Sequence, residues 1–148
     1  NNKIISDGKN VISIEIKGIK QLNKTIDKNF EKAVKTLSKV KGRVIITGVG
    51  KSGHIANKIS STMSSTGTPS QFCTPTDMSH GDLGVLKKKD ALIVISNSGN
   101  SHELTNLLDF AKKLSIPIIG ISSNSESDHF IPSRKCCKMK GVHQVALL

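Results

Sequence analysis

The sequence predicts a doubly wound α/β domain, in which a parallel sheet carries helices on both faces. Three short apolar runs rich in β-branched residues, at 44–47, 91–95 and 117–121, are typical of strands buried on both sides. Helical patterns of about a dozen residues separate such strands along the chain. Because strands and helices alternate, we expect right-handed crossovers and a parallel sheet.

The composition fits one domain of this kind. A chain of 148 residues with 36% hydrophobic content is the size of a single globular unit, which buries about two-thirds of its unfolded surface. Only 3% of the residues are aromatic, so the core must be aliphatic. We therefore interpret 1–148 as one domain, with an N-terminal helical region at 1–41, a core at 42–127 and an atypical tail at 128–148.

The net charge of +11 raises the question of a nucleic-acid partner. The lysines are spread along the chain, and no aromatic residues alternate with them for base stacking. We therefore expect no nucleic-acid partner. A positive field of this size would instead attract phosphorylated metabolites.

The cysteines give no sign of a disulfide framework or a metal centre. Cys73, Cys136 and Cys137 are odd in number and form no C-x-x-C pair. We expect no metal, no other cofactor and a cytoplasmic location, where thiols stay reduced. The sequence shows no secretory leader and no apolar run of about twenty residues, so we expect no association with a membrane.

The N-terminal region has a helical period. Between residues 12 and 37 apolar side chains recur every three or four positions, which predicts one or two amphipathic helices. The alternation at 11–16 also permits a short strand. The apolar positions are Ile12, Ile16, Ile19, Leu22, Ile26, Phe30, Val34 and Leu37.

The rest of the core alternates between helices and strands. A helix is predicted after Gly53, ending where Gly67 and Pro69 supply a stop signal. Residues 70–73 form a weaker strand candidate. A second helix is predicted over 104–114, where leucine and alanine share one face.

A glycine-rich turn follows the first strand. Residues 48–53 match the G-x-G-x-x-G pattern, but the acidic residue expected at the end of the next strand is missing. The phosphate-binding P-loop pattern fails because Ile45 stands where it needs glycine. What remains is a tight turn presenting Lys51 at the carboxyl end of a strand, where ligands bind in open α/β sheets. A solvated lysine on an ordinary turn is the alternative.

A hydroxyl-rich loop occupies the same position after the second strand. Residues 96–101 concentrate serine hydroxyls and amides before a helix, which indicates a cradle for a phosphate monoester. The alternative is helix capping, since Asn100 and Glu103 have the spacing of a capping box. We favour the cradle because one cap does not need three serines and a glycine.

Five histidines could take part in proton transfer. His80 is expected in a loop, where its titration range is useful, although taken alone it would be a surface histidine. His54 and His102 fall in the first turns of predicted helices and are expected to be solvated. His129 and His143 lie in the tail, whose sequence predicts no helix or strand.

Four motifs, GKSGH at 50–54, STGTP at 65–69, HGDLG at 80–84 and SNSG at 96–99, occur in one order with Glu103. From residue 8 to 127 the chain resembles the D-arabinose 5-phosphate isomerases of the SIS (sugar isomerase) family. The resemblance implies a flavodoxin-like three-layer sandwich with a five-stranded parallel sheet, assembled into dimers or tetramers. It also implies interconversion of D-arabinose 5-phosphate and D-ribulose 5-phosphate through an enediol, feeding 3-deoxy-manno-octulosonate synthesis for lipopolysaccharide or capsule.

The resemblance also assigns the site. Lys51, His80 and Glu103 match residues that line the family's active site, with Glu103 or His80 as acid and base. We expect the substrate phosphate to be held by Ser52, Ser96, Asn97, Ser98, Gly99 and Ser101.

Two other functions remain open from the sequence. A SIS domain without catalysis, acting as a sugar-phosphate sensor, would keep the phosphate loop but need no acid and base. A nucleotide-binding oxidoreductase is disfavoured by the missing ribose acid. Residues 128–148 depart from the family's continuing sequence, and the CBS pair that many members carry is not found in these 148 residues.

Overall fold

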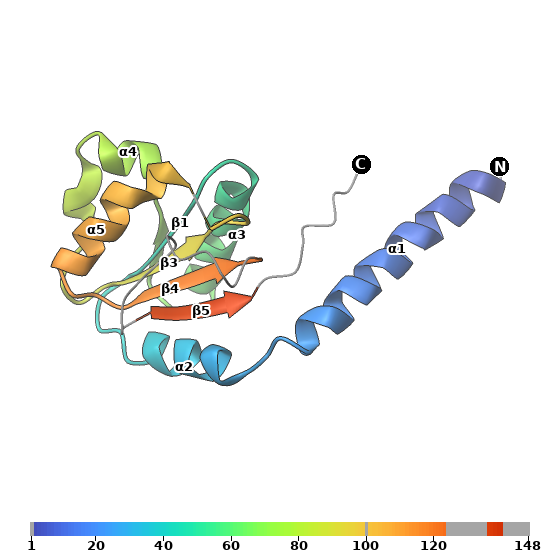
Figure 1. The fold of residues 1–148 in the computed structure, drawn as a ribbon, viewed down its shortest axis with the longest axis horizontal. Helices are drawn as coiled ribbons and strands as arrows, with labels where there is room; N and C mark the ends of the chain where they lie inside the picture. Colours follow the sequence, from blue (N-terminus) through green and yellow to red (C-terminus); the bar gives the residue numbers. More distant parts are fainter. Residues whose placement is uncertain (1, 100, 124–135, 141–148) are drawn as a thin grey trace.

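The computed structural model describes residues 2–99, 101–123 and 136–140, the last as backbone only. A five-stranded parallel sheet in the order β2-β1-β3-β4-β5 forms the centre (Figure 1). The strands are β1 (Val44–Gly48), β2 (Ser70–Phe72), β3 (Ala91–Ile95), β4 (Ile118–Ser122) and β5 (Cys136–Lys140). The helices are α1 (Asn2–Asn23), α2 (Lys28–Leu37), α3 (Lys51–Ser65), α4 (Pro75–Ser79) and α5 (Thr105–Lys113), with 3-10 turns η1 (Asp82–Val85) and η2 (His102–Leu104).

Helices cover both faces of this sheet, which confirms the predicted fold class. On one face, Val44 and Ile46 of β1 pack in the same cluster as Ala33 of α2 and Ala56 of α3. On the other face, Ile45 belongs to a second cluster with residues of α4 and α5. Because successive side chains of β1 enter opposite cores, the strand needs an unbroken apolar run rather than alternation.

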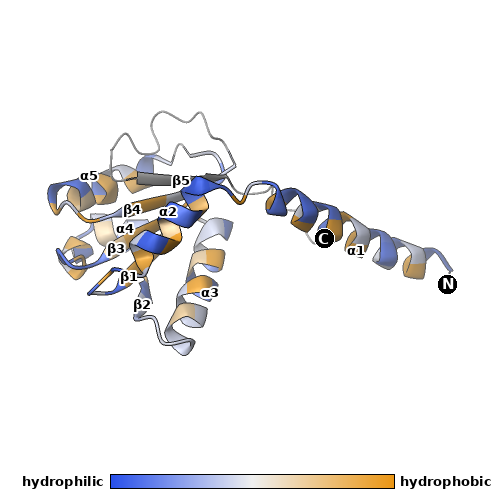
Figure 2. Ribbon diagram, turned by 90° about the horizontal axis from the view of Figure 1, so that it is seen from below, coloured by the Kyte–Doolittle hydropathy of each residue, from blue (hydrophilic) through white to orange (hydrophobic). Residues whose placement is uncertain are grey.

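The N-terminal region forms two helices. Asp27 caps α2, because its carboxylate accepts hydrogen bonds from the backbone N–H groups of Asn29 at 2.8 Å and Phe30 at 3.2 Å. The alternative of a strand at 11–16 is wrong, since these residues lie inside α1, where the helical period extends over 22 residues. α1 has no buried residue and projects from the rest of the molecule (Figure 2).

Three elements were not predicted from the sequence. α4 and η1 are a single turn each, too short to show a period. β5 falls in the tail, for which the sequence predicts no element, and it adds to the sheet beside β4. Its sequence, Cys-Cys-Lys-Met-Lys, contains two lysines and lacks the apolar run that marks the inner strands.

Candidate functional site

The candidate site lies where the sheet changes its winding direction. β1 and β3 are parallel neighbours, with Gly48 opposite Ile95 at their carboxyl ends. The chain leaves β1 into α3 on one face and leaves β3 toward α5 on the other face. Crevices at such switch points are the usual ligand sites of open α/β sheets. The fold therefore brings the glycine-rich turn and the 96–101 loop to one edge.

The glycines of the first turn allow a close approach between α3 and the sheet. A Cβ on Gly48 would lie 2.9 Å from the backbone of Ser52 and 3.0 Å from the carbonyl oxygen of Ile95. A Cβ on Gly53 would lie 2.8 Å from the carbonyl oxygen of Gly48. Gly50 has a φ of +57°, which favours glycine. The G-x-G-x-x-G match thus has a packing explanation that requires no nucleotide.

This turn sets Lys51 and Ser52 at the start of α3. The helix begins at Lys51 itself, so Gly53 lies within its first turn rather than before it. Lys51 is exposed and Ser52 is half-buried. Gly50 precedes the helix and provides no side-chain cap, and its carbonyl oxygen accepts hydrogen bonds from Gly53 and His54, so the N–H groups of Lys51 and Ser52 are left to solvent or a ligand.

The 96–101 loop is held by its own hydrogen bonds. The Oγ atom of Ser96 accepts a hydrogen bond from the N–H of Gly99 at 3.1 Å and lies 3.1 Å from the Oγ atom of Ser101. The carbonyl oxygen of Asn97 accepts a hydrogen bond from Ser122 Oγ at 3.2 Å, which ties the loop to the end of β4. The side chains of Asn97 and Ser98 are exposed at its tip.

The capping-box alternative involves Asn100 and Glu103. Asn100 lies outside the described residues. The residue preceding η2 is Ser101, and its hydroxyl makes no capping hydrogen bond. Glu103 is exposed in the first turn of η2.

His80 and Glu103 come from neighbouring elements. His80 caps the carboxyl end of α4, where its backbone N–H donates to the carbonyl oxygens of Thr76 and Asp77 at 3.1 Å. α4 packs against both η2, which carries Glu103, and α5. Within the described residues, the side chains of Lys51, His80 and Glu103 form no hydrogen bond or ion pair with one another. All three are exposed.

A cavity of about 310 Å³ adjoins the glycine-rich turn. His54 and Asn57, three residues apart on α3, face it together with Phe72 and Thr74 from the end of β2. We expected His54 only to be solvated; it is exposed, but it also lines this cavity. No sequence motif had indicated Asn57 or Phe72.

Thr74 could have been found from the sequence. It caps α4: its Oγ1 atom accepts a hydrogen bond from the N–H of Asp77 at 3.1 Å, and Pro75 occupies the first turn. A Thr-Pro-x-Asp segment has the features of a helix start. That pattern was present at 74–77 and would have predicted α4.

Cys73 connects β2 to α4 and is half-buried. Burial raises the pKa of its thiol; Asp82 and Asp77 raise it further, and Arg43 opposes them. The thiol is therefore protonated at neutral pH, which makes it a poor nucleophile.

Two kinds of feature are absent from the described part of the chain. Three or more His, Cys, Asp or Glu side chains do not gather there in a way that could hold a metal ion. Among the same residues, no helix combines the length and apolar character needed to cross a membrane.

Comparison with known proteins places these features in a family. The family model described as SIS domain matches residues 36–129. Arabinose 5-phosphate isomerase KdsD of Francisella tularensis strain SCHU S4 is 48% identical over 126 residues, which are 83% of this chain and 38% of that protein. The chain thus spans less than two-fifths of the length of this curated relative.

Solved structures agree with the fold. The structure of c3406 from Escherichia coli CFT073, in complex with arabinose 5-phosphate, superposes with a TM-score of 0.85 at 34% identity, covering 95% of this chain and 75% of that one. A sugar-phosphate isomerase structure from Listeria monocytogenes, described as putative in its own name, gives a TM-score of 0.82 at 31% identity, covering 88% and 69%.

Proposed function

The chain belongs to the SIS domain family, and we propose that it is the catalytic domain of a D-arabinose 5-phosphate isomerase. The observation that carries the proposal is the turn after β3, closed by Ser96 and Gly99, which lies beside the Lys51 turn at the switch point of the sheet. The chain around it is 48% identical to an arabinose 5-phosphate isomerase. The reaction interconverts D-arabinose 5-phosphate and D-ribulose 5-phosphate. Its role would be to supply 3-deoxy-manno-octulosonate synthesis in the cytoplasm.

The loop after β3 is the proposed phosphate site. Ser96 is only 4% exposed and is committed to holding the turn, whereas Asn97 and Ser98 present polar side chains at the surface of the loop. A phosphate there would meet hydroxyl, amide and backbone N–H donors, with Ser52 approaching from the neighbouring turn.

The proposed chemistry needs a base, an acid and a cation. Isomerisation removes a proton from C2 of the aldose and returns one to C1, through an enediol whose oxygen carries negative charge. Glu103 or His80, on adjacent packed elements, acts as base and acid. Lys51 stands at the end of β1 and would stabilise the charge on the oxygen. The phosphate loop holds the substrate in register for these steps.

We also propose that the domain assembles with copies of itself. α1 buries none of its residues and exposes a row of aliphatic side chains. An apolar surface of this extent commonly marks an interaction site. Exposed serines on α3, among them Ser61 and Ser64, would let a second helix approach closely. The exposed aliphatic residues of α1 are Ile4, Ile5, Val11, Ile12, Ile14, Ile16, Ile19 and Leu22.

The test is a coupled assay that measures D-ribulose 5-phosphate formed from D-arabinose 5-phosphate. Turnover that disappears in Glu103→Gln supports the isomerase. Binding of the sugar phosphate without turnover would instead identify a sensor domain, which keeps the phosphate loop alone. Binding of NADH, followed by the fluorescence of the added dinucleotide, would point to the oxidoreductase.

A further inference from the structure

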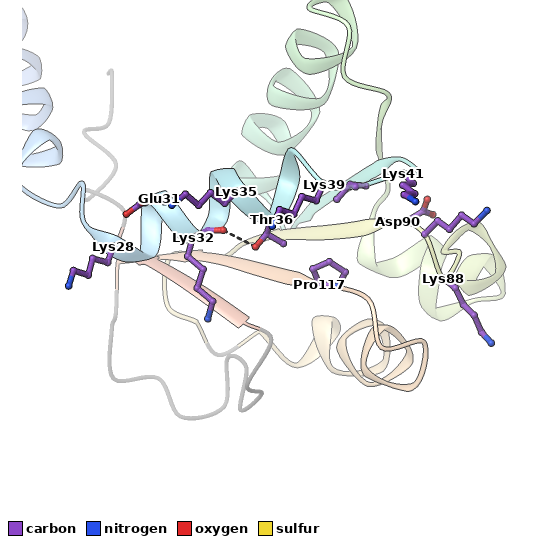
Figure 3. A pocket seen from close by; sticks show the side chains of 12 residues that line it. Lys28, Glu31, Lys32, Lys35, Thr36, Lys39, Lys41, Lys88, Asp90 and Pro117 are labelled. Carbon is purple, nitrogen blue, oxygen red and sulfur yellow. Dashed lines mark hydrogen bonds and ion pairs between the residues drawn. The ribbon is translucent and has the colours of Figure 1, made fainter.

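A second, larger cavity lies at the opposite edge of the sheet. It is an open cavity of about 660 Å³, bounded by α2, by the segments that enter β1 and β3, and by Pro117 before β4 (Figure 3). It therefore lies at the amino ends of the strands, away from the proposed isomerase site. Its lysines are Lys28, Lys32, Lys35, Lys39, Lys41, Lys88 and Lys89.

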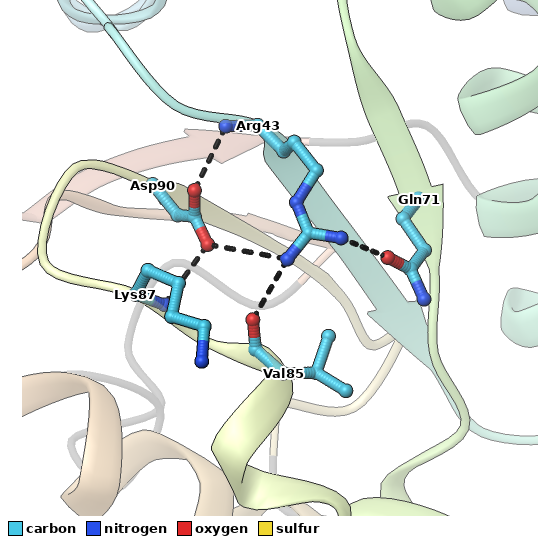
Figure 4. A network of polar contacts seen from close by, with 5 residues as sticks. All are labelled: Arg43, Gln71, Val85, Lys87 and Asp90. Atoms are coloured by element: carbon cyan, nitrogen blue, oxygen red, sulfur yellow. Dashed lines mark hydrogen bonds and ion pairs between the residues drawn. The ribbon is translucent and has the colours of Figure 1, made fainter.

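The two acidic residues of this cavity are already engaged. Glu31 pairs with Lys35 one turn along α2. Asp90 is 3% exposed, and its carboxylate accepts hydrogen bonds from the N–H groups of Arg43 at 2.8 Å and Lys87 at 2.9 Å (Figure 4). The Arg43 guanidinium lies 3.9 Å from the same carboxylate. The cavity therefore keeps a large excess of positive charge.

The backbone around Asp90 fixes the lysine-bearing segments close together. The N–H of Gly42 donates to the carbonyl oxygen of Lys89 at 2.9 Å. A Cβ on Gly42 would come within 2.3 Å of Asp90 Oδ1 and 2.7 Å of the Lys89 carbonyl oxygen. Lys41 and Lys89 therefore lie on neighbouring segments, and the close distance between these segments requires glycine at position 42.

The lysines of α2 form a stripe of positive charge, which destabilises the cavity when no anion is bound. Lys28, Lys32 and Lys35 lie three or four positions apart, and Lys39 follows shortly after the helix ends. Like charges at this spacing repel one another on a helix, and among the described residues Lys35 is the one lysine of this stripe with an ion-pair partner. An anion bound between α2 and the Lys88 turn would relieve this repulsion, and it would need charge at several points to reach all three segments.

We propose that this cavity binds a small oligophosphate, a ligand with at least two linked phosphate groups such as inorganic tripolyphosphate or a nucleoside triphosphate. Lysine ammonium groups bind phosphate as point charges without demanding a fixed geometry. The volume is that of a small-molecule site, and Val40 and Pro117 provide an apolar wall. The lining includes no aromatic side chain on which successive bases could stack, which disfavours single-stranded nucleic acid.

The test is calorimetric titration with sodium tripolyphosphate at physiological ionic strength. In Lys32→Gln/Lys39→Gln/Lys88→Gln the affinity should fall by at least about tenfold, since charged hydrogen bonds are lost. The matched control is Lys3→Gln/Lys24→Gln/Lys58→Gln, which removes the same charge from exposed lysines outside the cavity. Its affinity should change by less than about threefold, because only the distant field is altered.

Further arms separate this site from the isomerase site and from nucleic acid. Ser98→Ala should leave tripolyphosphate binding unchanged. No tripolyphosphate binding, or an equal loss in the control variant, would overturn the proposal. So would a single-stranded 12-mer that binds more tightly than tripolyphosphate and loses affinity in the cavity variant. Isomerase activity plays no part in these readouts, so the two proposals fail independently.

Discussion

The buried hydroxyl of Ser96 accepts a hydrogen bond from the backbone N–H of Gly99 at 3.1 Å, and this bond closes the turn that begins at the end of β3. Gly99 has a φ of +73°, which a residue with a Cβ rarely adopts. The turn at 96–99 therefore has a defined shape without a ligand, and binding does not have to supply its ordering.

A phosphate titration tests whether this loop is an anion site. Inorganic phosphate should raise the thermal midpoint of the domain progressively, because a ligand that binds only the folded state stabilises it by mass action. Ser98→Ala should reduce the shift. Differential scanning fluorimetry or circular dichroism gives the midpoint. A midpoint that stays constant over a broad phosphate range, or moves equally in the variant, contradicts the phosphate site.

Replacing Glu103 by glutamine separates catalysis from folding. Glu103→Gln keeps the size of the side chain and its hydrogen-bonding ability, so the melting temperature should hold. Turnover of D-arabinose 5-phosphate should drop by about a hundred- to ten-thousandfold, the usual cost of losing a positioned acid or base. Normal turnover with a lower melting temperature would make Glu103 a structural residue and His80 the preferred base.

Lys51→Ala should weaken both binding and turnover. A cation beside the phosphate or the enediolate acts on the ground state as well as on the transition state, so KM should rise and kcat should fall together. Lys58→Ala, on the same helix but two turns further from the strand end, is the matched control. A variant with unchanged kinetics would show that Lys51 is an ordinary solvated lysine.

The thiol of Cys73 should react slowly with alkylating agents. Burial raises its pKa, so the midpoint of its pH–rate curve should lie above that of an unfolded cysteine, at about 8.5. Because the pKa is higher in the folded state, folding favours the protonated thiol. The stability that this preference contributes is lost as pH rises through the raised pKa of Cys73. Iodoacetamide labelling of Cys136→Ser/Cys137→Ser, folded and in urea, makes the comparison. Equal midpoints in the two states would contradict the shift.

Light scattering tests the proposed self-assembly. At high concentration the chain should have the mass of a dimer or tetramer, and Ile12→Lys/Ile19→Lys should shift it toward the monomer by placing charge in the apolar row. Both residues are exposed, so the sheet should fold normally in the variant. A monomeric mass for the unchanged chain would remove the self-assembly proposal.

The inner strands were predictable because burial on both faces leaves a direct mark on the sequence. Ile45 and Ile46 enter opposite cores, so both positions must be apolar whatever the neighbouring residues are. The loop positions followed from the same runs, since parallel strands deliver their carboxyl ends to one edge. The resemblance to the SIS family was confirmed by the family model.

β5 and the lysine cavity depend on neighbours that a linear sequence does not reveal. β5 is an edge strand whose position is set by its hydrogen bonds to β4 rather than by its own composition. The lysine cavity joins α2 to the segments before β1 and β3, so no single stretch displays it. The same lysines, read along the chain, look only like scattered surface charge.

Because no residue of α1 is buried, its amide protons should exchange with deuterium through local opening of the helix. The amide protons of β1 and β3, which are buried strands, should exchange only when the whole sheet opens. The exchange rate of the α1 amides therefore reports whether another molecule covers this helix. Exchange that slows in α1 as protein concentration rises, and stays constant in the sheet, would map the contact surface onto the apolar row residue by residue.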